Sequence, residues 1–150
     1  MAEVVVRRAE RRDFPRLAEL MHLYVVDFYR QPEPDPAVMD RLRELMLEGN
    51  EGIQLVAEAD GDVVGFATIY FSWSTFTGER IGIMNDLYVV EPHRGSGAAR
   101  ALFTACREEC RARGFTEMSW ETAHDNHRAQ RFYAKVGGRR EDWLVYSIEP

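Results

Sequence analysis

The stretch EPHRGSGAARALF (residues 91–103) decides how this sequence folds, because its small residues join a strongly apolar segment to a helical one. Backbone N–H groups at the start of such a helix, together with the helix dipole, favour an anion. Small side chains also let a pyrophosphate approach the backbone closely. The residues expected to hold it are Arg94, Gly95, Ser96, Gly97, Ala98, Ala99 and Arg100.

Two common nucleotide-binding motifs do not fit this stretch. A P-loop needs a Lys-Ser/Thr pair after its last glycine, and none is present. A dinucleotide fingerprint needs a third glycine where Arg100 stands. A pair of glycines is often only a turn, but the position between a strand and a helix favours a pyrophosphate site without a metal ion.

The hydrophobic periodicity predicts an α/β fold in the order βααβββαβαβ, with a mixed, mostly antiparallel central sheet and helices on both faces. Asp13 is a plausible N-cap of the first helix, and a tight turn is expected at Asp60-Gly61. Strands are expected at residues 4–9, 53–59, 62–73, 80–91, 116–122 and 141–149, and helices at residues 11–29, 37–50, 96–113 and 126–137.

Length and composition predict one domain spanning residues 1–150. The chain has 45% hydrophobic and 29% charged residues, and no apolar run of membrane-spanning length, so no membrane partner is expected. The sequence has no basic patch with interleaved aromatic residues, so no nucleic-acid partner is expected. The N-terminus has no stretch typical of a signal peptide, which favours a cytoplasmic address. Cys106 and Cys110 share an apolar helix face, so we expect buried thiols.

Two segments together resemble the Gcn5-related N-acetyltransferase (GNAT) family. RGSGAA (residues 94–99) matches the family's Arg/Gln-x-x-Gly-x-Gly/Ala signature, and NHRAQRFYAKVGG (residues 126–138) is similar to its Asn-x-x-Ala-x-x-Phe/Leu-Tyr-x-x-x-Gly segment. The resemblance covers the whole chain and is strongest to the branch of diamine and histone/polyamine acetyltransferases. It implies acetyl-CoA as co-substrate, no metal, and a homodimer, since the family is frequently dimeric.

The resemblance also implies roles for single residues. Backbone groups of Leu87, Tyr88 and Val89 would bind the pantetheine arm, and an N–H of this strand would stabilise the oxyanion. Asn126 and Ala129 would contact the cofactor.

Acetyl transfer to an amine needs a base for the amine and an acid for the departing sulfur. A free alkylamine has a pKa of about 10.4, so it must lose a proton before it attacks. Tyr133 matches the family's usual acid. Diamine-acetylating relatives carry Glu-Asp where this chain has Asn85-Asp86, so Asp86 is the candidate base or amine ligand. An asparagine cannot act as a base, which weakens the case for a polyamine.

Further residues are candidates for the acceptor site. Tyr24, Asn85 and Trp73 are expected to line it, although strand aromatics often serve packing alone. Asp27 either faces the acceptor or is a solvated helix residue, and the sequence leaves both open. His124 and His127 have the spacing of a weak metal motif, but solvated loop histidines are the simpler interpretation.

These observations predict an acetyl-CoA-dependent N-acetyltransferase that acts by direct transfer on a small-molecule, diamine- or polyamine-like primary amine. One alternative is an acetyltransferase acting on protein or peptide amines. An alternative of another class is a non-catalytic acyl-CoA-binding module, which would have no need of an acid such as Tyr133.

Overall fold

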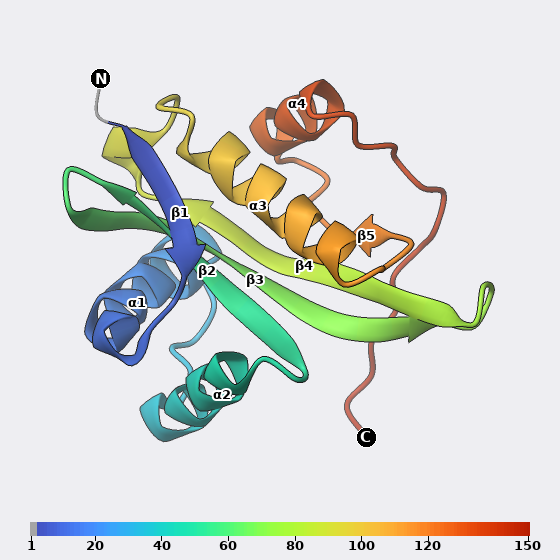
Figure 1. The fold of residues 1–150 in the computed structure, drawn as a ribbon, viewed down its shortest axis with the longest axis horizontal. Helices are drawn as coiled ribbons and strands as arrows, with labels where there is room; N and C mark the ends of the chain where they lie inside the picture. The colour runs from blue at the N-terminus through green and yellow to red at the C-terminus, as the bar shows by residue number, and fades with distance from the viewer. Residues whose placement is uncertain (1–2) are drawn as a thin grey trace. The chain divides into compact units, whose positions relative to one another are not determined.

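A five-stranded sheet organises the first part of the chain in the computed structural model, which describes residues 3–150 (Figure 1). The strands lie in the order β1-β2-β3-β4-β5; the first four are antiparallel to their neighbours, and β5 is parallel to β4. Their bounds are β1 (Val4–Arg8), β2 (Gly52–Ala59), β3 (Asp62–Ser74), β4 (Glu79–Val89) and β5 (Met118–Ser119). The predicted mixed, mostly antiparallel sheet is confirmed.

Three helices pack on this sheet: α1 (Phe14–His22), α2 (Pro36–Glu48) and α3 (Ala98–Ala112). Three short helical segments, η1 (Arg11–Asp13), η2 (Leu23–Phe28) and η3 (Glu91–His93), lie between the longer elements. α3 approaches one face so closely that a Cβ on Gly82 would lie 2.5 Å from the Cys110 sulfur and 3.3 Å from Ile69. Thr68, next to Ile69 in β3, faces the opposite side, where α1 and α2 lie.

Local sequence explains where these elements begin and turn. The Asp35 side chain accepts a hydrogen bond of 2.8 Å from the Ala37 N–H, and Pro36 occupies the first helical position of α2. Asp60 and Gly61 have φ values of 53° and 81°, the left-handed pair that a two-residue hairpin turn requires. The predicted turn between β2 and β3 is therefore confirmed.

Two local predictions need correction. Asp13 does not cap α1 through its side chain, because both carboxylate oxygens accept hydrogen bonds from Arg7, at 2.7 and 2.8 Å. The predicted helix at residues 11–29 is also not one α-helix, because the chain widens into the π-helical turn η2 after His22. A π-helical turn has i→i+5 hydrogen bonds in place of the i→i+4 bonds of an α-helix, and it often marks a functional site.

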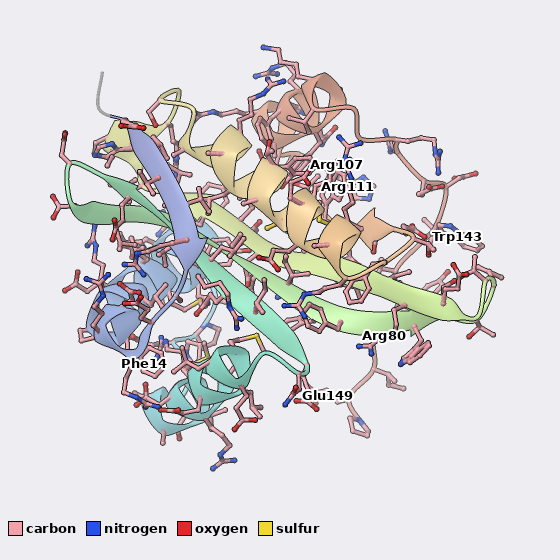
Figure 2. All side chains as sticks on the ribbon, viewed as in Figure 1. Phe14, Arg80, Arg107, Arg111, Trp143 and Glu149 are labelled. Carbon is pink, nitrogen blue, oxygen red and sulfur yellow. The ribbon has the colours of Figure 1, made fainter. Side chains whose placement is uncertain are left out.

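The chain divides into two compact units, Met1–Trp120 and Glu121–Pro150, and the second contains α4 (His127–Lys135). The strand predicted at residues 141–149 is wrong: this segment has no regular structure. Alternating apolar residues form a strand only where a neighbouring strand accepts their backbone hydrogen bonds. Large apolar side chains here remain exposed, among them Trp143 (labelled in Figure 2), Leu144, Val145, Tyr146 and Ile148.

Within residues 3–150, no helix combines the length and the apolar character needed to cross a membrane.

Candidate active site

A bulge in β4 places Asp86 on the face of the sheet that α1 and α2 cover. Thr68 of β3 pairs with Asp86, whereas the next β3 residue, Ile69, pairs with Met84, so Asn85 is the extra residue. β-Bulges re-aim the side chains that follow them and are frequent beside active sites. Asn85-Asp86, singled out in the sequence, therefore owes its placement to an irregularity in strand pairing.

Asp86 sits among polar groups but is largely removed from water. The Asn85 amide donates a hydrogen bond of 3.2 Å to its carboxylate. Burial raises the pKa of Asp86, against smaller opposing effects of hydrogen bonding by Thr68, Asn85 and Tyr24. A carboxylate with a raised pKa is a stronger base, which suits proton abstraction from an ammonium group.

Tyr24, which belongs to the π-helical turn η2, places its ring beside Asp86. Its centroid is 5.7 Å from the Phe66 ring and 5.5 Å from the Tyr88 ring, so aromatic packing fixes its position. Burial, and then the charge of Asp86, raise the pKa of Tyr24 well above its ordinary value. The Tyr24 hydroxyl therefore stays protonated and serves as a hydrogen-bond donor.

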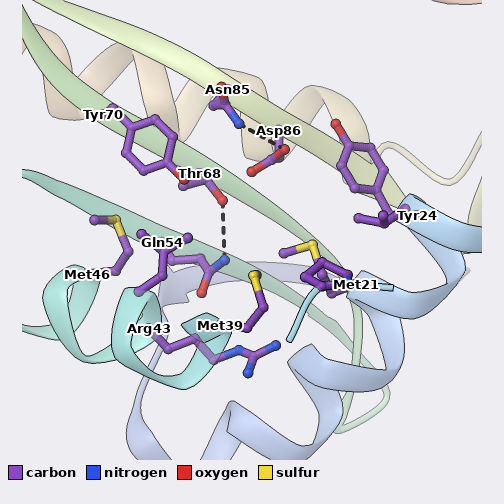
Figure 3. A pocket seen from close by; sticks show the side chains of 13 residues that line it. Met21, Tyr24, Met39, Arg43, Met46, Gln54, Thr68, Tyr70, Asn85 and Asp86 are labelled. Atoms are coloured by element: carbon purple, nitrogen blue, oxygen red, sulfur yellow. Dashed lines mark hydrogen bonds between the residues drawn. The ribbon is translucent and has the colours of Figure 1, made fainter. Parts of the chain in front are cut away.

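A cavity of about 200 Å³ opens over Asp86 between the sheet and the helices α1 and α2 (Figure 3). Its polar wall comes mainly from the sheet, where the Gln54 amide donates a hydrogen bond of 3.2 Å to the Thr68 hydroxyl. The cavity is lined by Met21, Tyr24, Val25, Pro34, Met39, Leu42, Arg43, Met46, Gln54, Thr68, Tyr70, Asn85 and Asp86. Its volume suits a small molecule.

Two of the predicted acceptor residues lie in this cavity and two do not. Tyr24 and Asn85 line it. Trp73 does not: it is 65% exposed, and its ring lies under the Arg80 guanidinium (labelled in Figure 2). It stands five positions beyond Thr68 in β3, a distance of roughly 17 Å. Asp27 is also outside the lining; its side chain is 58% exposed, and its Oδ1 lies 3.8 Å from the His22 Nε2.

Sequence reasoning missed several cavity residues. Gln54 and Thr68 are polar residues inside apolar strands, and Arg43 interrupts the apolar face of α2 formed by Met39 and Met46. The sequence did contain a signal for these residues, because a polar residue at a position that the periodic pattern predicts to be buried is unusual.

The loop before α3 has the backbone geometry expected of an anion site. Gly95 and Gly97 have φ values of 81° and 93°, and a Cβ added at either would meet no atom within 4 Å. These glycines therefore serve backbone conformation and leave open space above the loop. The N–H groups of Gly97, Ala99 and Arg100 have no hydrogen-bond partner within residues 3–150. Such donors fit a pyrophosphate.

The Arg94 side chain points toward two aromatic rings and does not extend over the loop. Its Nε donates a hydrogen bond of 3.1 Å to the Val89 carbonyl, and its guanidinium lies 5.7 Å from the Phe28 ring and 5.8 Å from the Tyr88 ring. Arg94 thus ties the loop to the end of β4. Arg100, in the first turn of α3, is exposed and adds positive charge at the loop.

The edge of β4 next to the loop is only partly covered by β5. β5 pairs with Gly82 and Ile83 alone, so β4 from Met84 onward extends beyond it. The predicted pantetheine-binding residues, 87–89, lie in the part of β4 that does not pair with β5.

Residues 17–138 match the Acetyltransferase (GNAT) family. The chain belongs to this family. As a GNAT protein, it is an acetyl-CoA-dependent N-acetyltransferase, which confirms the enzyme class predicted from its two motifs.

Three known proteins illustrate its range of relatives. An uncharacterized N-acetyltransferase of Bacillus subtilis, YhfO, is 30% identical over 141 residues, which cover 94% of this chain and 93% of the relative. The thialysine N-epsilon-acetyltransferase of Mus musculus is 28% identical over 66% of this chain and 61% of its own length. The structure of a ribosomal-protein-alanine N-acetyltransferase from Brucella melitensis biovar Abortus superposes with a TM-score of 0.80, at 25% identity over 98% of this chain and 99% of that one. The names of the last two proteins give different acceptor amines.

The buried thiols of this GNAT protein are unsuited to nucleophilic catalysis. Cys106 and Cys110 are both buried and free, as predicted. Burial raises the pKa of Cys106 far above its usual range and that of Cys110 to about 11. Both therefore remain protonated at neutral pH, where only a thiolate would attack a thioester.

Three predicted residues lie in the second unit. Asn126 caps α4, and its side-chain oxygen accepts a hydrogen bond of 3.1 Å from the Ala129 N–H, so this oxygen already has a partner. Tyr133 is half-buried on α4, where its ring centroid lies 5.5 Å from that of Phe132. The roles given to these residues remain predictions from the sequence. In the described part of the chain, no group of three or more His, Cys, Asp or Glu side chains is arranged to hold a metal ion.

Proposed function

We propose that this enzyme transfers the acetyl group of acetyl-CoA directly to the primary amine of a small molecule bound in the cavity over Asp86. The observation that carries the proposal is a partly buried carboxylate, with a raised pKa, in the wall of a cavity of about 200 Å³. A cavity of this size accepts a small amine more readily than a folded protein segment.

Each chemical step has a candidate residue in this chain. The thioester supplies the acetyl group. Asp86 binds the ammonium group and takes its proton, directly or through a water molecule. A backbone N–H of residues 87–89 donates a hydrogen bond to the carbonyl oxygen on which negative charge develops. Tyr133, from its motif position, gives a proton to the departing sulfur. The loop N–H groups of Gly97, Ala99 and Arg100 hold the pyrophosphate.

A diamine or polyamine acceptor, the finer prediction from the resemblance, receives mixed support. The similarity to the thialysine N-epsilon-acetyltransferase favours a small molecule with a terminal amine. Among residues 3–150, however, the cavity lining contains a single carboxylate, Asp86, and a buried cation, Arg43. A second ammonium group would therefore meet like charge at Arg43.

The proposal is tested by release of CoA from acetyl-CoA in the presence of a panel of acceptors. The panel contains 1-aminohexane, 1,6-diaminohexane, 6-aminohexanoate, spermidine, kanamycin and a peptide that begins with alanine. We expect turnover of at least one small amine at a kcat/KM above that of the peptide. Preference for the peptide would instead identify a protein acetyltransferase. Binding of acetyl-CoA without turnover of any acceptor would identify a binding module.

The location and assembly of the enzyme remain predictions from the sequence. We propose a cytoplasmic homodimer, in keeping with the resemblance. Light scattering on the purified chain measures the assembly directly, and a monomer at micromolar concentration would contradict it.

A further inference from the structure

Arg43 is a buried cation in the wall of the acceptor cavity. It is 5% exposed, and its Nε has no hydrogen-bond partner within the described residues, 3–150. Its ion pair with Asp40 is 2.9 Å long, and the Asp40 side chain is 65% exposed. A solvated carboxylate on one nitrogen leaves the rest of the guanidinium without a buried counter-charge.

A purely structural role explains this arginine poorly. The α2 face around it is apolar, with Met39, Leu42 and Met46 also lining the cavity. An aliphatic residue at position 43 would continue that face without leaving a buried N–H unsatisfied. Such an unpartnered group in a cavity wall is typical of a site that awaits a ligand.

The cation and the candidate base lie at different ends of the cavity. Gln54, Thr68 and Asp86 pair in one row across β2, β3 and β4, so two strand spacings, roughly 10 Å, separate Gln54 from Asp86. α2, which carries Arg43, packs on β2 at the Gln54 end of this row. Figure 3 shows Asp86 and Arg43 on opposite sides of the cavity, with Met21 and Met39 between them.

We propose that Arg43 binds the carboxylate of an acceptor whose primary amine lies at the other end of the molecule, at Asp86. This inference rests on the proposed function and narrows its substrate class to ω-amino carboxylates. The Arg43 Nε supplies a charge-assisted hydrogen bond, and the Gln54 amide, which uses one hydrogen on Thr68, has a second available. The methionine side chains would contact the methylene chain between the two charged ends.

Three acceptors that differ only at the far end test this proposal. They are 6-aminohexanoate, 1-aminohexane and 1,6-diaminohexane, which place a carboxylate, a methyl group or an ammonium group there. We expect the amino carboxylate to be acetylated with a kcat/KM about 10- to 100-fold above that of the monoamine, the worth of a hydrogen bond to a charged group. The diamine should be the poorest of the three.

Substitutions at position 43 assign that preference to the guanidinium. Arg43→Gln and Arg43→Met should lower the ratio of kcat/KM for the amino carboxylate to kcat/KM for the monoamine by about 10- to 100-fold. Arg41→Gln, an exposed arginine on the same helix, is the matched control and should retain the preference. Equal losses for all acceptors in both Arg43 variants, or no preference in the wild-type enzyme, would overturn the inference.

Binding of hexanoate separates this inference from the proposed function, because hexanoate keeps the carboxylate and lacks the amine. It should raise the melting temperature of the wild-type and Arg41→Gln proteins saturably, and not that of Arg43→Gln. If no amine is acetylated but hexanoate gives this pattern, the carboxylate site stands and the proposed reaction fails. If the monoamine is acetylated as well as the amino carboxylate and hexanoate does not bind, the reaction stands and the carboxylate site fails.

Discussion

Replacing Asp86 with asparagine tests the chemistry of the site most directly. The substitution keeps the side chain's shape, removes its charge and its ability to accept a proton, and replaces one acceptor oxygen with an NH2 donor. General base catalysis contributes about 10²- to 10⁴-fold, so kcat/KM for the acceptor should fall within that range. The KM for acetyl-CoA should change little, because the loop that begins α3 is untouched.

The pH dependence of the same variant supplies a second measurement. Burial raises the pKa of Asp86, so the acidic limb of the wild-type profile of kcat/KM should lie above about pH 4, the range of an ordinary aspartate. Asp86→Asn should lose this limb. Asp62→Asn, which removes an exposed carboxylate at the far end of β3, is the control and should retain both rate and profile.

Stability measurements distinguish a loss of catalysis from misfolding, because the two predict opposite changes of the melting temperature. A carboxyl group whose pKa is raised on folding destabilises the folded state once it ionises. Asp86→Asn should therefore raise the melting temperature at pH 7, and the gain should shrink as the pH falls through the raised pKa of Asp86. A variant with full kcat/KM and an unchanged acidic limb would refute the assignment of Asp86 as the base.

Three further predictions concern the loop, the acid and the sheet. Gly97→Ala, at a φ of 93°, should raise the KM for acetyl-CoA, whereas Gly61→Ala, at 81° in the β2–β3 turn, should cost similar stability and leave that KM unchanged. Tyr133→Phe should lower kcat by about 10²- to 10⁴-fold with CoA affinity retained in calorimetry; full kcat would show that water protonates the sulfur. Asp13→Asn should cost about 2–4 kcal/mol in urea unfolding, because Asp13 accepts two hydrogen bonds from Arg7 and one from the Glu10 N–H. Hydrogen bonding by Arg7 lowers the pKa of Asp13, so this stabilisation is present above about pH 4 and is lost as the pH falls through the lowered pKa. If the free energy of unfolding of Asp13→Asn depended on pH as strongly as that of the wild-type protein, this account would be contradicted.

Much of the fold is fixed by local chemistry that the sequence displays. Asp60-Gly61 specifies a tight turn because few other pairs adopt two consecutive left-handed residues. Gly95 and Gly97 mark the candidate anion-binding loop for the same conformational reason, since both have positive φ values. Cys106 and Cys110 fall on the buried face of α3 because helical periodicity places residues four apart on one side. The family motifs at residues 94–99 and 126–138 then identify the enzyme class.

The proposed acceptor site, in contrast, depends on contacts between distant segments. Nothing local separates Asp27 from Asp86; only the packing of η2 and the bulge at Asn85 leaves the first solvated and turns the second into the cavity. Trp73 belongs to β3 like Thr68, but its distance along the strand removes it from the site.

The same limit applies to Arg43 and to residues 141–149. In the sequence, Arg43 is one charged residue within an amphipathic helix; its burial opposite Asp86 follows from α2 packing on β2. Residues 141–149 alternate as a strand does, but they have no regular structure, because backbone pairing needs a partner that a local pattern does not supply. The sequence by itself therefore determined the turns, the helix faces and the candidate cofactor loop, whereas the candidate acceptor site required tertiary structure, since burial and pairing are properties of segments that meet only on folding.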